Sequence, residues 1–481
     1  MLSPVRQEQS PRRISAFPLR FLWNYGERCD ILSLTKQKPK GAANVNALTY
    51  EQLDAFRAGY ENDRAARTAT AAMAKTELGD LAFLPMEAAK LNGEFALEVK
   101  TRGVTAQEKS GRCWMFAALN ILREVVAEKL GLKEFEFSEN YLAFYDKLEK
   151  CNNFLEMVIA SADMPLDDRM MEYILGGIGD GGYWDMAVDL IRKYGVVPKY
   201  VMPENYQSSH TEKFRKQLND LQRKDACVLR AVAAPGGDLQ AEKQRMMAEL
   251  YKAECIVFGE PVQRFDFTYR DERGAYHADR GLTPQEFYER YVGFALEDYI
   301  CVSNSPTAKT PLGALYEFHY MGSMAESNIR TLNLSMDELQ ELALAQLRGG
   351  TPVWFACDSG AFGDRKQGVW DPDSFDYEGL LGGAELRMSK TDALEYRQSG
   401  ATHAMILVGA DFDENGSPTR WKIENSWGNE NGRDGYFVCS QRYFREYVYE
   451  AIIDKKLLSD SQRALLEAEP VVLQPWEGSV L

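Results

Sequence analysis

Two reactive residues stand at the starts of the two most clearly predicted elements of this chain. Apolar residues recur at helical spacing between Ser110 and Gly131, which predicts a helix with Cys113 in its first turn. About 290 residues later, His403 directly precedes an apolar run, residues 404–409, that is typical of a strand. A chain that uses this thiol and this imidazole together must combine helices with a sheet, so we expect an α+β fold.

The rest of the chain divides by composition into five segments. A helix begins after Leu48, with Thr49 as its N-cap, and another runs from Gly182 to Gly195. Four strands are predicted at residues 352–357, 404–410, 421–425 and 436–438. The predicted segments are a basic flexible extension (1–45), a helical lobe with Cys113 (46–198), a charged helical insertion (199–350), a β-rich lobe with His403 and Asn425 (351–455) and a C-terminal arm (456–481).

Composition excludes several classes of protein. The net charge of −16 disfavours nucleic acid as a partner, because an acidic surface repels phosphate. No apolar run is long enough to span a membrane, and the N-terminal region has no secretory core. The eight cysteines form no CxxC pair and no dense framework, which is typical of free thiols in a reducing compartment. We therefore expect a cytoplasmic protein without a membrane anchor.

Cys113 is the candidate nucleophile. Unpaired N–H groups at a helix start and the positive end of the helix dipole stabilise a thiolate. Gln107 lies six residues upstream, where its side-chain amide and the Cys113 backbone N–H would together form an oxyanion hole. The alternative is a buried structural cysteine, which is the commonest role of an unpaired Cys.

His403 is the candidate base among four histidines. His210, His277 and His319 have no chemical partner nearby in the sequence, and we interpret them as structural. Asn425 follows on the next predicted strand, where it would orient the imidazole, and Trp427 would shield that hydrogen bond from water. The alternative is a pair of ordinary strands with a polar edge.

A glycine-rich segment, residues 177–182, formally matches the dinucleotide-binding pattern GxGxxG. That pattern requires a preceding strand, whereas residues 169–175 are predicted to be helical, so a dinucleotide site is rejected. Gly181 and Gly182 instead suit a position where a substrate backbone lies close to the enzyme.

Four motifs in this order resemble the papain superfamily: Gln-x5-Cys-Trp ending at Trp114, Gly-Gly-Tyr ending at Tyr183, His-Ala starting at His403, and Asn-Ser-Trp-Gly starting at Asn425. The resemblance implies a papain-like, two-lobed cysteine peptidase with a helical lobe and a β-barrel-like lobe. It implies Cys113 as nucleophile, His403 as acid and base, Asn425 as its orienter and Gln107 as oxyanion donor. It also implies that Gly181, Gly182 and Trp427 contact the substrate.

The spacing of the motifs and the residues around them indicate one family within this superfamily. Papain-type His and Asn residues lie about 130–150 residues after the Cys, and the excess here matches the insertion at 199–350. Residues 110–120, 141–150 and 193–198 are similar to bleomycin hydrolase and aminopeptidase C. That family implies a homohexameric cage assembled through the insertion. It also implies a C-terminal arm in the cleft, whose last carboxylate, on Leu481, meets the free amino group of a peptide.

The resulting hypothesis is a cysteine aminopeptidase that needs no metal or organic cofactor. The ending Gln474-Pro-Trp476-Glu-Gly-Ser-Val-Leu481 departs from the usual ending of the family. Two alternatives therefore stay open: an endopeptidase with an unblocked cleft, and a cage that binds peptides without turnover.

Overall fold

The computed structural model describes residues 47–325 and 327–477 and separates into two units, residues 1–64 and 65–481. In the first unit, helix α1 (Tyr50–Asn62) begins as predicted at Thr49. The Thr49 hydroxyl accepts the Gln52 N–H at 3.2 Å, and the Gln52 side chain accepts the Thr49 N–H at 2.9 Å. This reciprocal pair satisfies two backbone donors that the first turn leaves without a helical partner.

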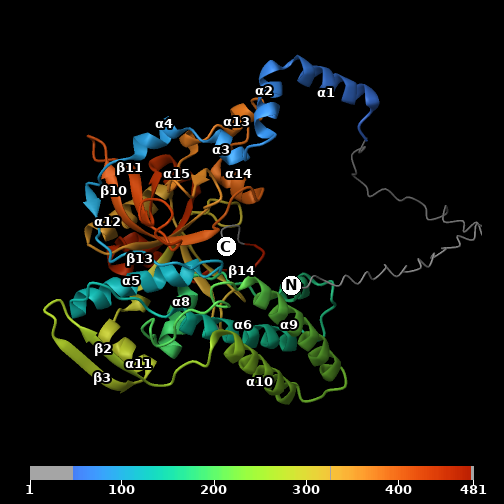
Figure 1. Cartoon of the computed structure of the whole chain (residues 1–481). Coiled ribbons are helices and arrows are strands. Elements are labelled where there is room, and N and C mark those ends of the chain that lie inside the picture. The colour runs from blue at the N-terminus through green and yellow to red at the C-terminus, as the bar shows by residue number, and fades with distance from the viewer. Residues whose placement is uncertain (1–46, 326, 478–481) are drawn as a thin grey trace, which may run out of the picture. The chain divides into compact units, whose positions relative to one another are not determined.

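A single large sheet organises the second unit (Figure 1). Most neighbouring strands are antiparallel, and three pairs are parallel: β14–β5, β4–β6 and β12–β9. The strand order is β14 (Val471–Leu473), β5 (Ala314–Phe318), β6 (Ile329–Asn333), β4 (Tyr299–Ser303), β13 (Val448–Asp454), β7 (Val353–Cys357), β10 (His403–Phe412), β11 (Pro418–Glu424), β12 (Tyr436–Ser440), β9 (Val369–Trp370) and β8 (Gly363–Asp364), while β1 (Leu97–Glu98) also pairs with β10.

Both faces of this sheet are buried. Along β10, Ile406 belongs to one apolar core, while its neighbours Met405 and Leu407 belong to a second core. This alternation follows from the two-residue period of a strand. The first core contains α5 (Cys113–Leu130) and α8 (Trp184–Tyr194), and the second contains α12 (Met336–Arg348) and α15 (Gln441–Tyr447). Burial on both faces explains why these strands are continuous apolar runs in the sequence.

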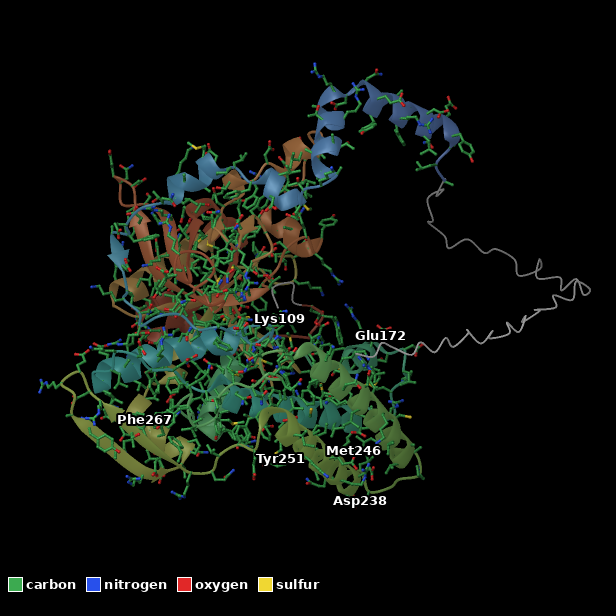
Figure 2. The ribbon with its side chains drawn as sticks, in the orientation of Figure 1. Lys109, Glu172, Asp238, Met246, Tyr251 and Phe267 are labelled. Carbon is green, nitrogen blue, oxygen red and sulfur yellow. The ribbon has the colours of Figure 1, made fainter. Side chains whose placement is uncertain are left out.

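A helical cluster lies beyond α5, on the side away from the sheet (Figure 1). Its members are α6 (Glu139–Ala160), α7 (Arg169–Gly176), α9 (Glu212–Ala233) and α10 (Leu239–Phe258). A separate hairpin, β2 (Phe265–Arg270) with β3 (Tyr276–Leu282), packs through Phe267 on the α5 core. Figure 2 labels Phe267 on this hairpin and Met246, which is fully buried, on α10.

The remaining helices are short and lie in the connections and near the C-terminus. They are α2 (Arg64–Met73), α3 (Leu78–Ala82), α4 (Pro85–Ala88), α11 (Pro284–Phe287), α13 (Tyr377–Leu380), α14 (Lys390–Glu395) and α16 (Asp460–Leu466).

The predicted helices and strands around the reactive residues are confirmed. Helix α5 ends at Gly131, which adopts the left-handed conformation that favours glycine, with φ 62°. Strand β10 begins at His403, and helix α7 occupies the segment before the glycines, which confirms that no strand precedes them.

The prediction that residues 199–350 are mainly helical is wrong for their second half. Helices α9 and α10 fill residues 212–258, but strands β2 to β6 occupy residues 265–333, and β4, β5 and β6 join the main sheet. These three strands are five residues long and almost wholly buried, so they lack the alternation of apolar and polar residues that marks a half-exposed strand. The segment therefore extends the sheet in addition to supplying helices.

Candidate active site

Cys113 is the first residue of α5 and is half-buried at the edge of a cavity. Burial raises the pKa of its thiol, while the backbone N–H groups of Ala404, Trp114 and Cys113 itself act to lower that pKa. The N–H groups at the helix start therefore act to lower the thiol pKa, as predicted. The effect of burial is larger, so the pKa is raised overall and the thiol is neutral near pH 7. The contact with Ala404 places the start of α5 against the start of β10, directly beside His403.

The His403 ring is buried and fixed by its neighbours. Its Nε2 lies 2.9 Å from Oδ1 of Asn425, and the same oxygen accepts the Ser426 backbone N–H at 2.8 Å. Because Oδ1 can only accept, Nε2 carries the ring proton and Nδ1 keeps a free lone pair. The Trp427 ring stacks on the imidazole, with ring centres 4.7 Å apart. The structure thus brings His403, Asn425 and Trp427 together as expected.

Burial also sets the basicity of this imidazole. It lowers the pKa of His403 to about 4, with the Asn425 hydrogen bond acting in the opposite direction and the positive charge of Arg365 adding to the decrease. The Arg365 guanidinium lies 4.5 Å from the centre of the Trp427 ring. His403 is therefore neutral near pH 7, which is the form that accepts a proton.

Gln107 is buried beside the same segment, and Ser426 orients its side chain. The Ser426 hydroxyl donates to Gln107 Oε1 at 2.7 Å, and Gln107 Nε2 donates to the Ser110 carbonyl at 2.6 Å. An amide nitrogen has two hydrogens, so one donor remains for a further acceptor. The Gln107 backbone N–H also donates to the Ser426 carbonyl at 2.8 Å. Sequence reasoning missed Ser426, although it stands inside the Asn-Ser-Trp-Gly motif.

Trp114 connects the sheet, the start of α5 and the glycine-rich loop. Its carbonyl accepts the indole N–H of Trp354 in β7 at 3.0 Å, and its own indole N–H donates to the Asp180 carbonyl at 2.9 Å. A Cβ on Gly182 would lie only 2.5 Å from the Trp114 ring, whereas a Cβ on Gly181 would meet nothing within 4 Å. Gly182 is therefore required for packing, and Gly181 leaves the cavity wall open.

Buried charged side chains of α6 bind the glycine-rich loop. Lys150 donates to the Gly181 carbonyl at 2.7 Å and to Asp146 at 3.0 Å, and Lys147 pairs with Asp146 and Asp180. Burial lowers the pKa of Lys150 to about 8, although the Asp146 charge opposes this shift. The charged residues of the 141–150 motif therefore fix the loop that carries Gly181.

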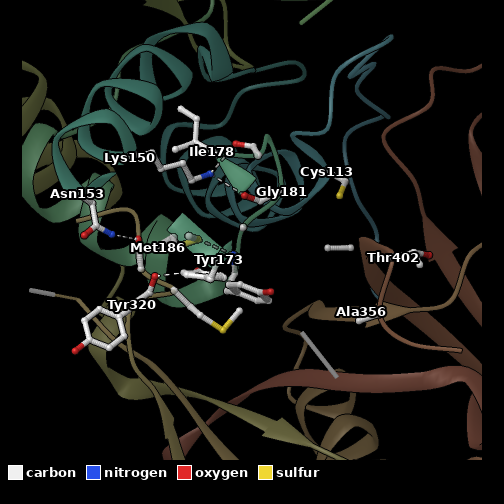
Figure 3. A pocket seen from close by; sticks show the side chains of 18 of the residues that line it. Cys113, Lys150, Asn153, Tyr173, Ile178, Gly181, Met186, Tyr320, Ala356 and Thr402 are labelled. Carbon is white, nitrogen blue, oxygen red and sulfur yellow. Dashed lines mark hydrogen bonds between the residues drawn. The ribbon is translucent and has the colours of Figure 1, made fainter. Parts of the chain in front are cut away.

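These elements enclose one cavity of about 350 Å³ that Cys113, His403, Gly181 and Gly182 all line. Figure 3 shows Lys150, Ile178 and Gly181 on one side of this cavity, and Ala356 and Thr402 on the opposite side. One wall therefore comes from the helices and the glycine-rich loop, and the other comes from the ends of β7 and β10.

The chain's C-terminal region lies beside this cavity, because Trp476 and Glu477 line a second cavity that shares Thr402 with it. Strand β14 pairs with β5, and the chain then continues to Trp476, whose ring lies 4.9 Å from the Arg169 guanidinium and 6.4 Å from the Tyr173 ring. Tyr173 lines the cavity, and Glu477 pairs with Lys309 at 3.2 Å. Leu481, the predicted anchor for the substrate amino group, lies outside the described residues.

The described part of the chain meets neither the requirements of a three-ligand metal site nor those of a membrane-spanning helix. Within residues 47–325 and 327–477, no group of three or more His, Cys, Asp or Glu side chains is placed to hold a metal ion. Among the same residues, no helix is long and apolar enough to cross a membrane. His277 and His319 contact Asp271 and Glu317, which agrees with their structural interpretation.

A buried ion pair fixes the loop that leads into α5. Arg112, the residue before Cys113, donates from both terminal nitrogens to the two oxygens of Glu204, at 3.0 and 2.9 Å. Burial acts to raise the pKa of Glu204, but the Arg112 charge together with hydrogen bonds from Arg112 and Ser208 holds that pKa below its usual range. The Arg112 side chain is almost fully buried. Sequence reasoning gave neither residue a role, because 92 positions separate them.

We predict that Glu204→Gln destabilises the protein by about 3–5 kcal/mol, because it leaves the buried Arg112 charge uncompensated. The measurement is the denaturant midpoint of unfolding. Asp220→Asn is the matched control, since it removes the exposed pair with Lys216 and should leave the midpoint unchanged. An unchanged midpoint in Glu204→Gln would show that Arg112 finds water or another partner.

Known proteins resemble this chain over most of its length. The sequence profile of the Peptidase C1-like family matches residues 47–479. An aminopeptidase C from Streptococcus thermophilus is 41% identical over 388 residues, which cover 80% of this chain and 87% of that protein. An aminopeptidase G from Lactobacillus delbrueckii subsp. lactis is 40% identical over 435 residues, which cover 90% and 99%. The crystal structure of PepW from Lactobacillus rhamnosis HN001 superposes with a TM-score of 0.87 at 40% identity, covering 90% of this chain and 98% of that one.

Proposed function

The chain belongs to the Peptidase C1-like family, and we propose that it is a cysteine aminopeptidase that releases N-terminal residues from peptides. One observation carries the proposal: Cys113 and His403 line the same cavity, and His403 is held by Asn425 with its Nδ1 lone pair unused. Relatives named aminopeptidase C and aminopeptidase G, at 40–41% identity, support the same activity.

In the proposed mechanism, His403 Nδ1 takes the proton from the Cys113 thiol as sulfur attacks the peptide carbonyl. The carbonyl oxygen gains the negative charge, and the spare N–H of Gln107 and the Cys113 backbone N–H stabilise it. The imidazolium then gives its proton to the leaving amine as the C–N bond breaks. Water, deprotonated by His403, hydrolyses the thioester and returns the thiol. Each step uses side chains of this chain alone.

The C-terminal region supplies the proposed selectivity for free N-termini. Pairing of β14 with β5 fixes the chain before Gln474, and the Trp476 ring then lies 6.4 Å from the ring of Tyr173, which lines the cavity. We propose that the residues beyond Glu477 continue along the cavity and exclude longer chains, with the Leu481 carboxylate meeting the substrate amino group. If they do not, the same site is an endopeptidase.

The larger organisation expected from the resemblance belongs to the same proposal. A helical lobe with Cys113 and a β-rich lobe with His403 and Asn425 would form a papain-like pair around the cavity. The homohexameric cage and the cytoplasmic location stay predictions.

Replacing the nucleophile tests the chemistry. We expect Cys113→Ala to lose on the order of 10⁵–10⁶-fold in kcat on a fluorogenic alanyl substrate, because the acyl-enzyme cannot form. Cys227→Ala is the matched control, since this exposed thiol should be dispensable. Full activity in Cys113→Ala would remove the mechanism, and a wild type that binds peptide without turnover would favour the non-catalytic cage.

Removing the C-terminal residues tests the selectivity. Wild type should hydrolyse an alanyl fluorogenic substrate much faster than its N-acetylated counterpart, because the cleft beyond the first residue is blocked. A variant truncated before Gln474 should cleave the acetylated compound with increased kcat/KM. The control is an unchanged midpoint of thermal unfolding. Equal cleavage of both compounds by wild type would identify an open-cleft endopeptidase.

The pH profile tests the state of the base. His403 must be neutral to accept a proton, and burial lowers its pKa to about 4. We therefore expect kcat/KM to persist below pH 6.5 and to fall only as the pH decreases through about 4. Activity recovered on return to pH 7 controls for acid unfolding. An acid limb centred near 6.5 would mean that the ring is solvated in the free enzyme.

A further inference from the structure

Glu450 is a buried carboxylate that faces the active-site cavity without a partner. It is only 2% exposed, and it lines the cavity together with Cys113 and His403. Within the described residues 47–325 and 327–477, burial and the Asp185 charge act on its carboxyl group, and neither a hydrogen bond nor a cation does. Buried carboxylates are normally paired, because an isolated one loses hydration without compensation. An exception at a cavity wall indicates a ligand that supplies the missing partner.

A β-bulge directs Glu450 toward the cavity. In the pairing of β13 with β7, Val448 lies opposite Cys357 and Glu450 lies opposite Ala356, so Tyr449 is an extra residue. Val448 and Cys357 belong to the core on the far face of the sheet, whereas Ala356 belongs to the core on the cavity face. Regular alternation would have placed Glu450 on the same face as Val448. The inserted residue reverses this and points the carboxylate into the cavity.

The surroundings of Glu450 favour a positive ligand. Burial raises its pKa to about 8, and the negative charge of Asp185 on α8 adds to this increase. Tyr183, which also lines the cavity, has its own pKa raised by burial and by the Glu450 charge. With this pKa the carboxyl group is mostly protonated near pH 7, and a cation beside Glu450 would favour its ionised form. The described residues provide no group of three ligands for a metal ion, which leaves an organic cation as the chemical class.

We propose that Glu450 binds a positively charged group of the peptide substrate and so determines specificity at this site. The inference rests on the proposed peptidase function and deepens it. Two groups on a peptide carry this charge: the free α-ammonium of the N-terminal residue, which Glu450 would share with the Leu481 carboxylate, and the side chain of a lysine or arginine. Both reach the cavity while the scissile carbonyl sits at Cys113, because Cys113 and Glu450 line the same space.

The experiment compares wild type with Glu450→Gln on two pairs of fluorogenic substrates. The first pair is alanyl and N-acetylalanyl, which differ only in the α-ammonium. The second pair is lysyl and norleucyl, which differ only in the side-chain charge. We expect Glu450→Gln to lower kcat/KM for the charged member of one pair by roughly 10- to 100-fold, and to leave its uncharged partner unchanged. The affected pair identifies the source of the charge.

Glu254→Gln is the matched control. Glu254 on α10 is equally buried and has an oxygen without a partner among the described residues, but it lies against Cys151. It should change neither substrate ratio. If Glu450→Gln keeps both wild-type ratios while hydrolysis still requires Cys113, the role of Glu450 is overturned and the peptidase function stands.

A binding measurement separates the two proposals when turnover is absent. Lysinamide or alaninamide should raise the unfolding temperature of Cys113→Ala more than their N-acetylated counterparts do, and adding Glu450→Gln should abolish the difference. If wild type hydrolyses no substrate, the proposed function fails, and this shift still decides whether Glu450 binds a cation. An equal shift with and without Glu450→Gln would overturn the inference.

Discussion

The two hydrogen bonds of Trp114 are the interaction on which the rest of the site depends. Its carbonyl receives the Trp354 indole from the sheet, and its own indole N–H holds the Asp180 carbonyl of the glycine-rich loop. The residue that follows the candidate nucleophile thus joins both cavity walls. The Trp114 ring leaves no room for a side chain at position 182, so this position of the loop must be glycine. Catalysis requires reacting groups to be held in a fixed geometry, and these two hydrogen bonds fix the two cavity walls relative to each other.

Three consecutive residues, 425–427, contact both the candidate base and the candidate oxyanion donor. Asn425 fixes the tautomer of His403, the Ser426 hydroxyl orients the Gln107 amide, and the Trp427 ring covers the imidazole. Because Asn425 Oδ1 can only accept a hydrogen bond, Nε2 of His403 carries the ring proton. One stretch of backbone thereby positions both the candidate base and the candidate oxyanion donor.

The buried ionisable side chains around the cavity are of two kinds: those that form ion pairs, and Glu450, which does not. Arg112 with Glu204, and Lys147 with Asp180, are paired ions that hold the two loops flanking Cys113. Such pairs contribute little net stability but make loss of one partner costly, so they favour one loop conformation. Glu450 differs, since neither a cation nor a hydrogen bond acts on it among the described residues, and a bulge directs it inward. The paired charges hold structure in place, and the unpaired carboxyl group of Glu450 faces the cavity.

The sequence by itself determined the local elements and the identity of the reactive groups. Helical periodicity placed Cys113 at a helix start, a continuous apolar run placed His403 at a strand start, and ordered motifs singled out Asn425 and Gln107. Those signals are local, because they arise from backbone periodicity and short spacing. Only the tertiary structure decided which distant residues meet. Strands β4 to β6 became part of the sheet because both their faces are buried, and Glu450 turned inward because a pairing partner far along the chain created a bulge. The pKa values of Cys113 and His403 likewise follow from burial, which depends on contacts between segments hundreds of residues apart.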